Sequence, residues 1–256
     1  MKVLILSIFN ETDYYKKMKN IQMKYVNNNE HIDYYFITFK TFMSKNVEII
    51  NNIIYVKGVE TAMNILEKTI VALDYLINIK KNTYDYIIRT NISTIFNYTL
   101  LIQYLHSIPQ NDIYIGGIFF KLAWLDYKYG INDYKIDLYS LQNLYYFQGT
   151  GITMSFDVVQ CILQNKINLK YDIIDDVAIG LFIKNYIPKA YSRMLEIPHM
   201  KYSKNCFTNE AVIIRNRLGD IGAIGGDITE EYIINNMDQI VTNHILVDKL
   251  ENDSDS

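Results

Sequence analysis

The stretch that most constrains the fold runs over residues 84–97, where an apolar segment turns abruptly polar. Its first half, YDYII, is rich in β-branched and aromatic residues, which is typical of a buried strand. Its second half carries Arg89, Asn91 and Ser93. Ligands of α/β proteins bind just beyond the carboxyl ends of such strands. The stretch therefore predicts either a ligand-binding strand end or a strand that runs into an ordinary polar loop.

Apolar segments of strand and helix character alternate from the start of the chain. Residues 2–9 form a continuous apolar run, as expected for a strand of a parallel sheet that is covered on both faces. Residues 14–28 and 61–80 carry apolar side chains at helical spacing, and residues 34–39 and 53–56 have strand character. This alternation predicts a single α/β domain with a mostly parallel, Rossmann-like sheet flanked by helices.

Composition argues against several classes of protein. The 256 residues carry a net charge of −3 and no basic run, so we expect no nucleic-acid partner. The apolar start is short and lacks a small-residue cleavage site, so we expect no signal peptide, and no stretch approaches the roughly 20 apolar residues of a membrane span. Cys161 and Cys206 follow no metal-binding spacing and suit a reducing compartment. We therefore expect a soluble, cytoplasmic protein, and the sequence leaves a homo-oligomer open.

Two further signals lie in the second half of the chain. Gly149 and Gly151 flank Thr150, which leaves the backbone free to bend tightly or to approach a ligand. Asp175 and Asp176 stand at the start of a predicted helix, where a carboxylate gains about 0.3–1 kcal/mol from the positive end of the helix dipole. The two aspartates therefore either cap the helix or carry a function.

Three segments in this order resemble the GT-A fold nucleotide-sugar glycosyltransferases, and among them the β-1,3-galactosyltransferase-like and Fringe-like enzymes. The apolar strand and Arg89-Thr90 stand where these enzymes lead into Asp-x-Asp. Residues 149–155 match their Gly-x-Gly, short apolar segment and Ser, and residues 175–180 match their Glu/Asp-Asp-Val-x-x-Gly. The resemblance covers residues 84–184 and extends more loosely to residue 1.

The resemblance implies a division of the chain. A GT-A domain would span residues 1–245, with the donor half over 1–120 and the acceptor half over 121–245, and residues 246–256 would be an acidic, disordered tail. Trp124 lies in an aromatic stretch without clean periodicity, which would line an acceptor site or be a surface insertion packed on its own tyrosines.

The resemblance also implies an activity: inverting transfer of a sugar from a nucleotide-sugar donor, UDP-linked, to a sugar or glycan hydroxyl. Asp176 would be the catalytic base, and Asp175 would orient it or bind acceptor hydroxyls. Gly149 and Gly151 would let main-chain amides meet the sugar or the acceptor. At the first strand end, Ser7 and Phe9 would face the nucleotide or be plain strand residues, and the second alternative is favoured for each taken singly.

One departure from the family concerns the metal. Asn91-Ile92-Ser93 stands where Asp-x-Asp would hold Mn²⁺ or Mg²⁺, and hard divalent ions prefer carboxylate oxygens. We therefore expect weakened, water-mediated or absent metal binding at Asn91 and Ser93. His199 stands where some relatives supply a late histidine ligand, although a histidine beside a proline is more often a loop residue.

Without a metal, cationic side chains would have to share the negative charge of the leaving diphosphate. The candidates are Arg89, Lys68, Arg215 and Arg217, since arginine pairs well with phosphate. Lys68 lies among apolar neighbours, and we favour the interpretation that its flexible stem reaches past them to water. The alternative is that it pairs with the diphosphate.

Two other hypotheses stay open. The first is a non-catalytic protein, derived from such an enzyme, that binds a nucleotide sugar or a glycan. The second is an unrelated nucleotide-binding α/β protein, but the chain has no Gly-x₄-Gly-Lys-Ser/Thr phosphate loop, which argues against an NTPase.

Overall fold

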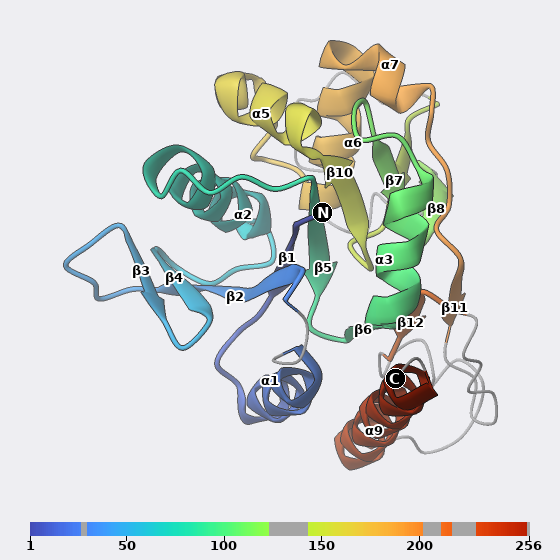
Figure 1. Ribbon diagram of the computed structural model, residues 1–256. Coiled ribbons are helices and arrows are strands. Elements are labelled where there is room, and N and C mark those ends of the chain that lie inside the picture. Colours follow the sequence, from blue (N-terminus) through green and yellow to red (C-terminus); the bar gives the residue numbers. More distant parts are fainter. Residues whose placement is uncertain (27–29, 123–142, 202–210, 217–228, 255–256) are drawn as a thin grey trace.

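The computed structural model describes residues 1–26, 30–122, 143–201, 211–216 and 229–254. A seven-stranded sheet in the order β3-β4-β2-β1-β5-β10-β7 lies at its centre, with helices on both faces (Figure 1). The strands are β1 (Val3–Ile8), β2 (Ile32–Lys40), β3 (Val47–Ile50), β4 (Ile53–Lys57), β5 (Tyr86–Asn91), β7 (Tyr114–Gly116) and β10 (Ile152–Ser155). The mixed α/β fold that the sequence predicts is thereby confirmed.

The four strands at the middle of the sheet run parallel. β4 pairs with β2, β2 with β1, and β1 with β5, all in parallel register. β3 at one end and β10 near the other are antiparallel to their neighbours. From β1 the chain continues to β2 on one side, whereas β5 lies on the other side. The junction of β1 and β5 is therefore the switch point at which ligands bind in open α/β sheets.

Alternate residues of β1 pack against different sets of helices. Val3 and Ile5 join one hydrophobic core with helices α1, α3 and α9, whereas Leu4 and Leu6 join a second core with α2, α5 and α6. Such double burial explains why the strand reads as a continuous apolar run. The helices are α1 (Asp13–Val26), α2 (Ile65–Asp74), α3 (Tyr98–Ser107), α5 (Phe156–Gln164), α6 (Asp175–Tyr186), α7 (Pro188–Tyr191) and α9 (Glu230–Ser254).

Two small sheets extend the architecture. β12 (Ile213–Arg215) lies between β11 (His199–Lys201) and β6 (Thr94–Phe96), and β8 (Phe119–Lys121) pairs with β9 (Tyr145–Phe147). None of the helices in the described part of the chain is long and apolar enough to cross a membrane.

Several element boundaries differ from those that the sequence predicts. β5 continues through Arg89 to Asn91 because these polar residues pair with the end of β1. The helix expected over 61–80 begins at Ile65 and ends in a π-helical turn. The glycine pair at 116–117 separates the short strands β7 and β8. The last helix continues to Ser254 and takes in most of the segment expected to be a disordered tail.

Candidate functional site

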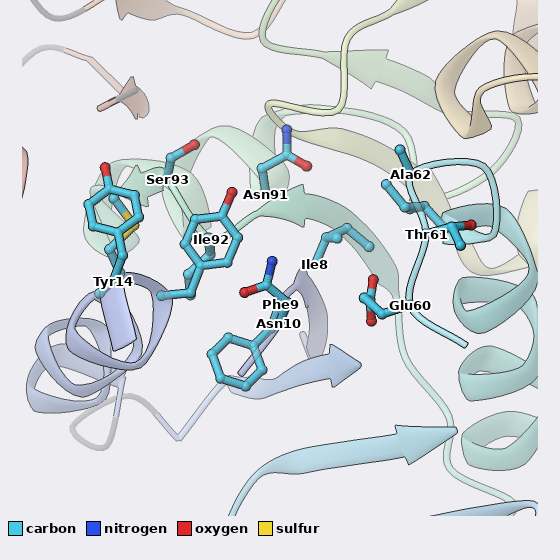
Figure 2. A pocket seen from close by; sticks show the side chains of 13 residues that line it. Ile8, Phe9, Asn10, Tyr14, Glu60, Thr61, Ala62, Asn91, Ile92 and Ser93 are labelled. Carbon is cyan, nitrogen blue, oxygen red and sulfur yellow. The ribbon is translucent and has the colours of Figure 1, made fainter. Parts of the chain in front are cut away.

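A cavity of about 610 Å³ opens at the carboxyl ends of β1 and β5, at the switch point of the sheet (Figure 2). Four segments form its wall: the end of β1, the first turns of α1, the loop before α2, and the link from β5 to β6. The lining residues are Ile8, Phe9, Asn10, Tyr14, Tyr15, Met18, Glu60, Thr61, Ala62, Ile65, Asn91, Ile92 and Ser93.

The structure separates the two residues that were expected near a nucleotide, Ser7 in β1 and Phe9 directly after it. Phe9 lines the cavity, but its ring is 1% exposed and packs edge-on against Phe36. Ser7 is fully buried and is not part of the lining. The aromatic side chains with partly exposed surface in the cavity are instead Tyr14 and Tyr15 of α1. Sequence reasoning missed both as site residues, although their place in the first turn of the helix that follows the first strand is a usable signal.

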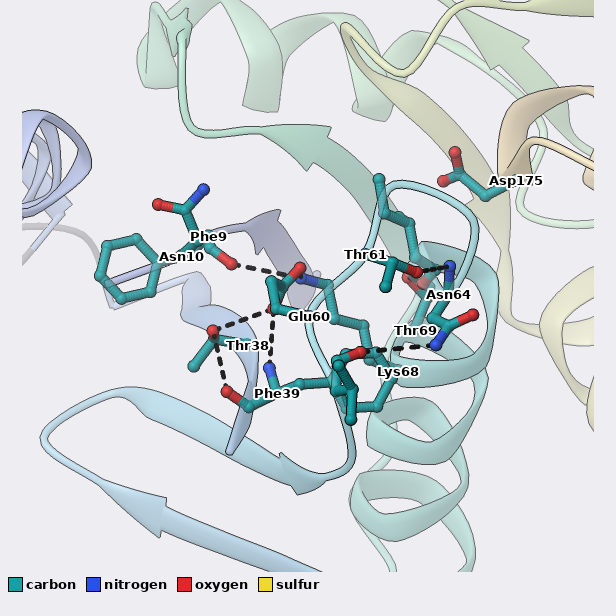
Figure 3. Close-up of polar contacts among 12 residues, drawn as sticks. Phe9, Asn10, Thr38, Phe39, Glu60, Thr61, Asn64, Lys68, Thr69 and Asp175 are labelled. Carbon is teal, nitrogen blue, oxygen red and sulfur yellow. Dashed lines mark hydrogen bonds and ion pairs between the residues drawn. The ribbon is translucent and has the colours of Figure 1, made fainter. Parts of the chain in front are cut away.

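Lys68 does not reach water, so the interpretation favoured from the sequence is wrong. Its side chain is 0% exposed, with Nζ 2.5 Å from Oε1 of Glu60 and 3.2 Å from the carbonyl oxygen of Phe9 (Figure 3). The physical reason is that α2 presents Lys68 to the buried ends of β1 and β2, where a carboxylate and a carbonyl oxygen satisfy the ammonium group. Burial lowers the pKa of Lys68, and the Glu60 carboxylate opposes that shift.

Arg89 joins the three segments that carry the family resemblance. Its side chain is 3% exposed, and Nη2 lies 2.5 Å from Oδ2 of Asp175. Nη1 donates to the carbonyl oxygen of Gly149 at 2.8 Å and to Oδ1 of Asn91 at 3.1 Å. One buried guanidinium therefore connects the end of β5, the turn before β10 and the start of α6.

Asp176 lies next to this cluster and remains half-buried. The backbone amides of Val177 and Gly149 donate to its carboxylate, the first at 2.9 Å. The pKa of Asp176 is raised to about 7, first by burial and then by the negative charge of Asp175, while Arg89 and the two backbone amides act in the opposite direction. A carboxyl group that titrates near neutral pH suits general acid or base chemistry, which needs a pKa close to the working pH.

Arg215 is directed at the glycine turn and is not part of the cavity lining. Its side chain is buried, and Nη1 donates to Oε1 of Gln148 at 2.5 Å and to Oγ1 of Thr150 at 2.8 Å. On the other side of the turn, the hydroxyl of Thr90 donates to the carbonyl oxygen of Thr150 at 2.6 Å. These contacts hold the Gln148–Thr150 turn between β5 and β12.

The glycine at position 149 is required by the packing of Arg89. A Cβ added at Gly149 would overlap the guanidinium, which cannot move without breaking its contacts to Asp175 and Asn91. A Cβ added at Gly151 would instead meet the flexible methyl end of Ile213 at 2.9 Å.

We therefore expect Gly149→Ala to cost about 1–3 kcal/mol of unfolding free energy, as overpacking of a buried site does, and Gly151→Ala to cost less. Urea unfolding of the two variants beside the wild type checks this. Equal losses would show that the guanidinium adapts to the added methyl group.

The residues present do not fit a Mn²⁺ or Mg²⁺ site. Asn91 and Ser93 offer neutral oxygens, and Oδ1 of Asn91 already accepts a hydrogen bond from the Arg89 cation, which would repel a second positive charge. In the described ranges, no three His, Cys, Asp or Glu side chains gather as a metal would require. His199 opens β11, but its side chain is outside what the structure describes, as are Trp124 and Arg217.

Comparison with known proteins adds little to this picture. No family model matches the sequence, and no curated protein matches it. Among solved structures, the chain is similar to an active-site mutant of LgtC, with 11% sequence identity over 84% of this chain and 86% of the LgtC chain and a TM-score of 0.39. The assignment of this protein to the mixed α/β class rests on its own seven-stranded sheet.

Proposed function

We propose that this protein is an inverting, GT-A type glycosyltransferase that moves a sugar from a UDP-linked donor to a sugar or glycan hydroxyl. The observation that carries the proposal is the connected set of polar residues between the cavity and Asp176. Arg89 donates to Oδ1 of Asn91 in the cavity wall and to the carbonyl oxygen of Gly149, and it forms an ion pair with Asp175. The Gly149 amide in turn donates to the Asp176 carboxylate. The β-1,3-galactosyltransferase-like character rests on the sequence motifs alone.

The chemistry assigns one step to each part of this site. The Asp176 carboxylate takes the proton of the acceptor hydroxyl while that oxygen bonds the anomeric carbon. The bond from the anomeric carbon to the diphosphate oxygen breaks, and the nucleoside diphosphate leaves with the electron pair. A positioned general base contributes about 10²–10⁴ in rate. Asp175 orients Arg89 and, through its charge, keeps the pKa of Asp176 high.

The leaving diphosphate must be stabilised by the polar groups near the cavity. Asn91 and Ser93 supply an amide and a hydroxyl in the wall, and Arg89 supplies positive charge behind it. Preorganised donors of this kind act without a metal when they point at the developing charge. Arg215 contributes indirectly, because it holds the glycine turn that positions Asp176.

A panel of nucleotide sugars tests the proposal. Thermal shifts with UDP-, GDP- and dTDP-sugars identify the donor, and release of free nucleoside diphosphate, measured with and without sugar acceptors, reports turnover. We expect a UDP-sugar to stabilise the protein and an acceptor to accelerate release. The absence of any stabilising nucleotide sugar would contradict the proposal.

A non-catalytic nucleotide-sugar- or glycan-binding protein is the second candidate. This candidate is favoured because two of the cations near the cavity already have carboxylate partners: Lys68 is paired with Glu60, and Arg89 is paired with Asp175. The same panel separates the two candidates, since a pure binder is stabilised by the nucleotide sugar but releases no nucleoside diphosphate.

Removal of divalent ions should have little effect on activity. The reason is the donor set at Asn91 and Ser93, which has neutral oxygens and a neighbouring guanidinium. Turnover measured in EDTA should stay close to that in buffer with added Mn²⁺. Complete inhibition by EDTA that only Mn²⁺ reverses would show that a metal binds despite this donor set.

A further inference from the structure

Glu60 has an unusual position in the cavity. Among the described residues that line the cavity, it alone carries a formal charge. It belongs to the loop between β4 and α2, yet the backbone N–H of Phe39, near the end of β2, donates to it at 2.9 Å. The carboxylate is thereby held next to the end of β1, opposite the cavity wall that α1 forms (Figures 2 and 3).

The carboxylate of Glu60 keeps one acceptor position for a ligand. Lys68 donates to Oε1, and the Phe39 amide and the Thr38 hydroxyl donate to Oε2. An ionised carboxylate has about four lone-pair positions, so one position on Oε1 is left. The side chain is 34% exposed, whereas Lys68 behind it is fully buried. The three protein donors fix the orientation of the group, which makes it a preorganised acceptor.

The charge of this group selects the part of a nucleotide that can approach it. A phosphate entering the cavity would meet the negative oxygens of Glu60 before the buried Lys68, and like charges at contact distance repel. Only a neutral hydrogen-bond donor suits the position, which leaves ribose hydroxyls and base N–H groups. Bases stack on aromatic faces. The partly exposed aromatic side chains of the cavity are Tyr14 and Tyr15 of α1, and Tyr14 lies on the side opposite Glu60 (Figure 2).

We propose that Glu60 accepts a hydrogen bond from a ribose hydroxyl of the bound nucleotide and so directs its phosphates away from α2 toward Asn91. This inference rests on the proposed function, because it concerns the nucleotide half of the same donor. It assigns Glu60 a role in binding and Lys68 the role of holding Glu60 in place.

The test compares UDP with 2′,3′-dideoxy-UDP, which lacks both ribose hydroxyls, by titration calorimetry. A hydrogen bond to a charged acceptor predicts that the wild type binds UDP roughly ten- to a hundredfold more tightly. The double variant Glu60→Gln/Lys68→Met removes both charges of the ion pair together and so avoids a buried lysine without its partner. The side-chain oxygen of the introduced glutamine accepts the hydrogen bond from the Phe39 amide, so the variant should bind both nucleotides equally.

The control is Glu67→Gln, which removes a carboxylate from the exposed side of α2 and should keep the full preference for UDP. Equal binding of the two nucleotides by the wild type would overturn the role of Glu60 while leaving the proposed function intact, and so would a double variant that keeps the preference. Failure of the wild type to bind either nucleotide would overturn the proposed function itself. If the double variant does not fold, the wild-type affinities for UDP and 2′,3′-dideoxy-UDP still decide whether the ribose hydroxyls are recognised. The single variant Glu60→Asp should then show a weaker preference for UDP.

Discussion

Asp176→Asn is expected to abolish sugar transfer and to leave the donor bound as tightly as in the wild type. Asparagine has the same shape and can keep the hydrogen bonds from the Val177 and Gly149 amides, but its amide cannot take the proton of the acceptor hydroxyl. Loss of a general base lowers kcat by about 10²–10⁴. Turnover and donor affinity measured side by side check the prediction, with the exposed Asp172→Asn as the matched control.

The pH profile provides an independent check on Asp176. Its pKa is raised to about 7, and the base must be ionised to act, so wild-type kcat/KM should rise as pH increases through about 7. A raised pKa also means that the native protein loses stability relative to the unfolded chain as pH rises from the ordinary carboxyl pKa of 3.8 to about 7, and that this loss is complete above pH 7. At pH 8 the Asp176→Asn variant should therefore have a higher Tm than the wild type. Unchanged turnover in the variant would remove Asp176 from the mechanism.

Arg89→Met is expected to cause the largest loss of stability. Asp175 is 6% exposed and pairs with Arg89, so the substitution leaves a buried carboxylate without its cation. Breaking a buried ion pair in this way costs about 3–5 kcal/mol. The carbonyl oxygen of Gly149 and Oδ1 of Asn91 lose a donor at the same time. Urea unfolding gives the free-energy difference directly.

Two further variants test whether the broken ion pair causes the loss of stability in Arg89→Met. Arg89→Met/Asp175→Asn removes both charges and should recover part of the stability that the single substitution loses. Lys24→Met breaks an exposed ion pair of similar length, 2.6 Å to Asp238, and should cost less than about 1 kcal/mol. If Arg89→Met costs no more than Lys24→Met, the buried pair does not hold the three segments together.

The sequence alone determined the fold class and several elements. The doubly covered β1 was readable because both faces of the strand are apolar, and α1 was readable because its apolar residues recur at helical spacing. The start of α6 at Asp175 followed from the carboxylates in its first turn. These signals are local, so each can be recognised without knowing what packs on it.

Only the tertiary structure decided what surrounds each polar side chain. Lys68 and Arg89 are both cations that follow apolar residues in the sequence, and the fold buries each of them against a carboxylate. The partner of Lys68 is Glu60 in the loop before α2, and the partner of Arg89 is Asp175, which is distant in the chain. Glu60 follows β4 but is held at the end of β2, a position that no spacing pattern encodes. A side chain's partners depend on how strands align across the sheet, and that alignment is set by long-range packing, so the chemistry of the cavity had to be read from the structure.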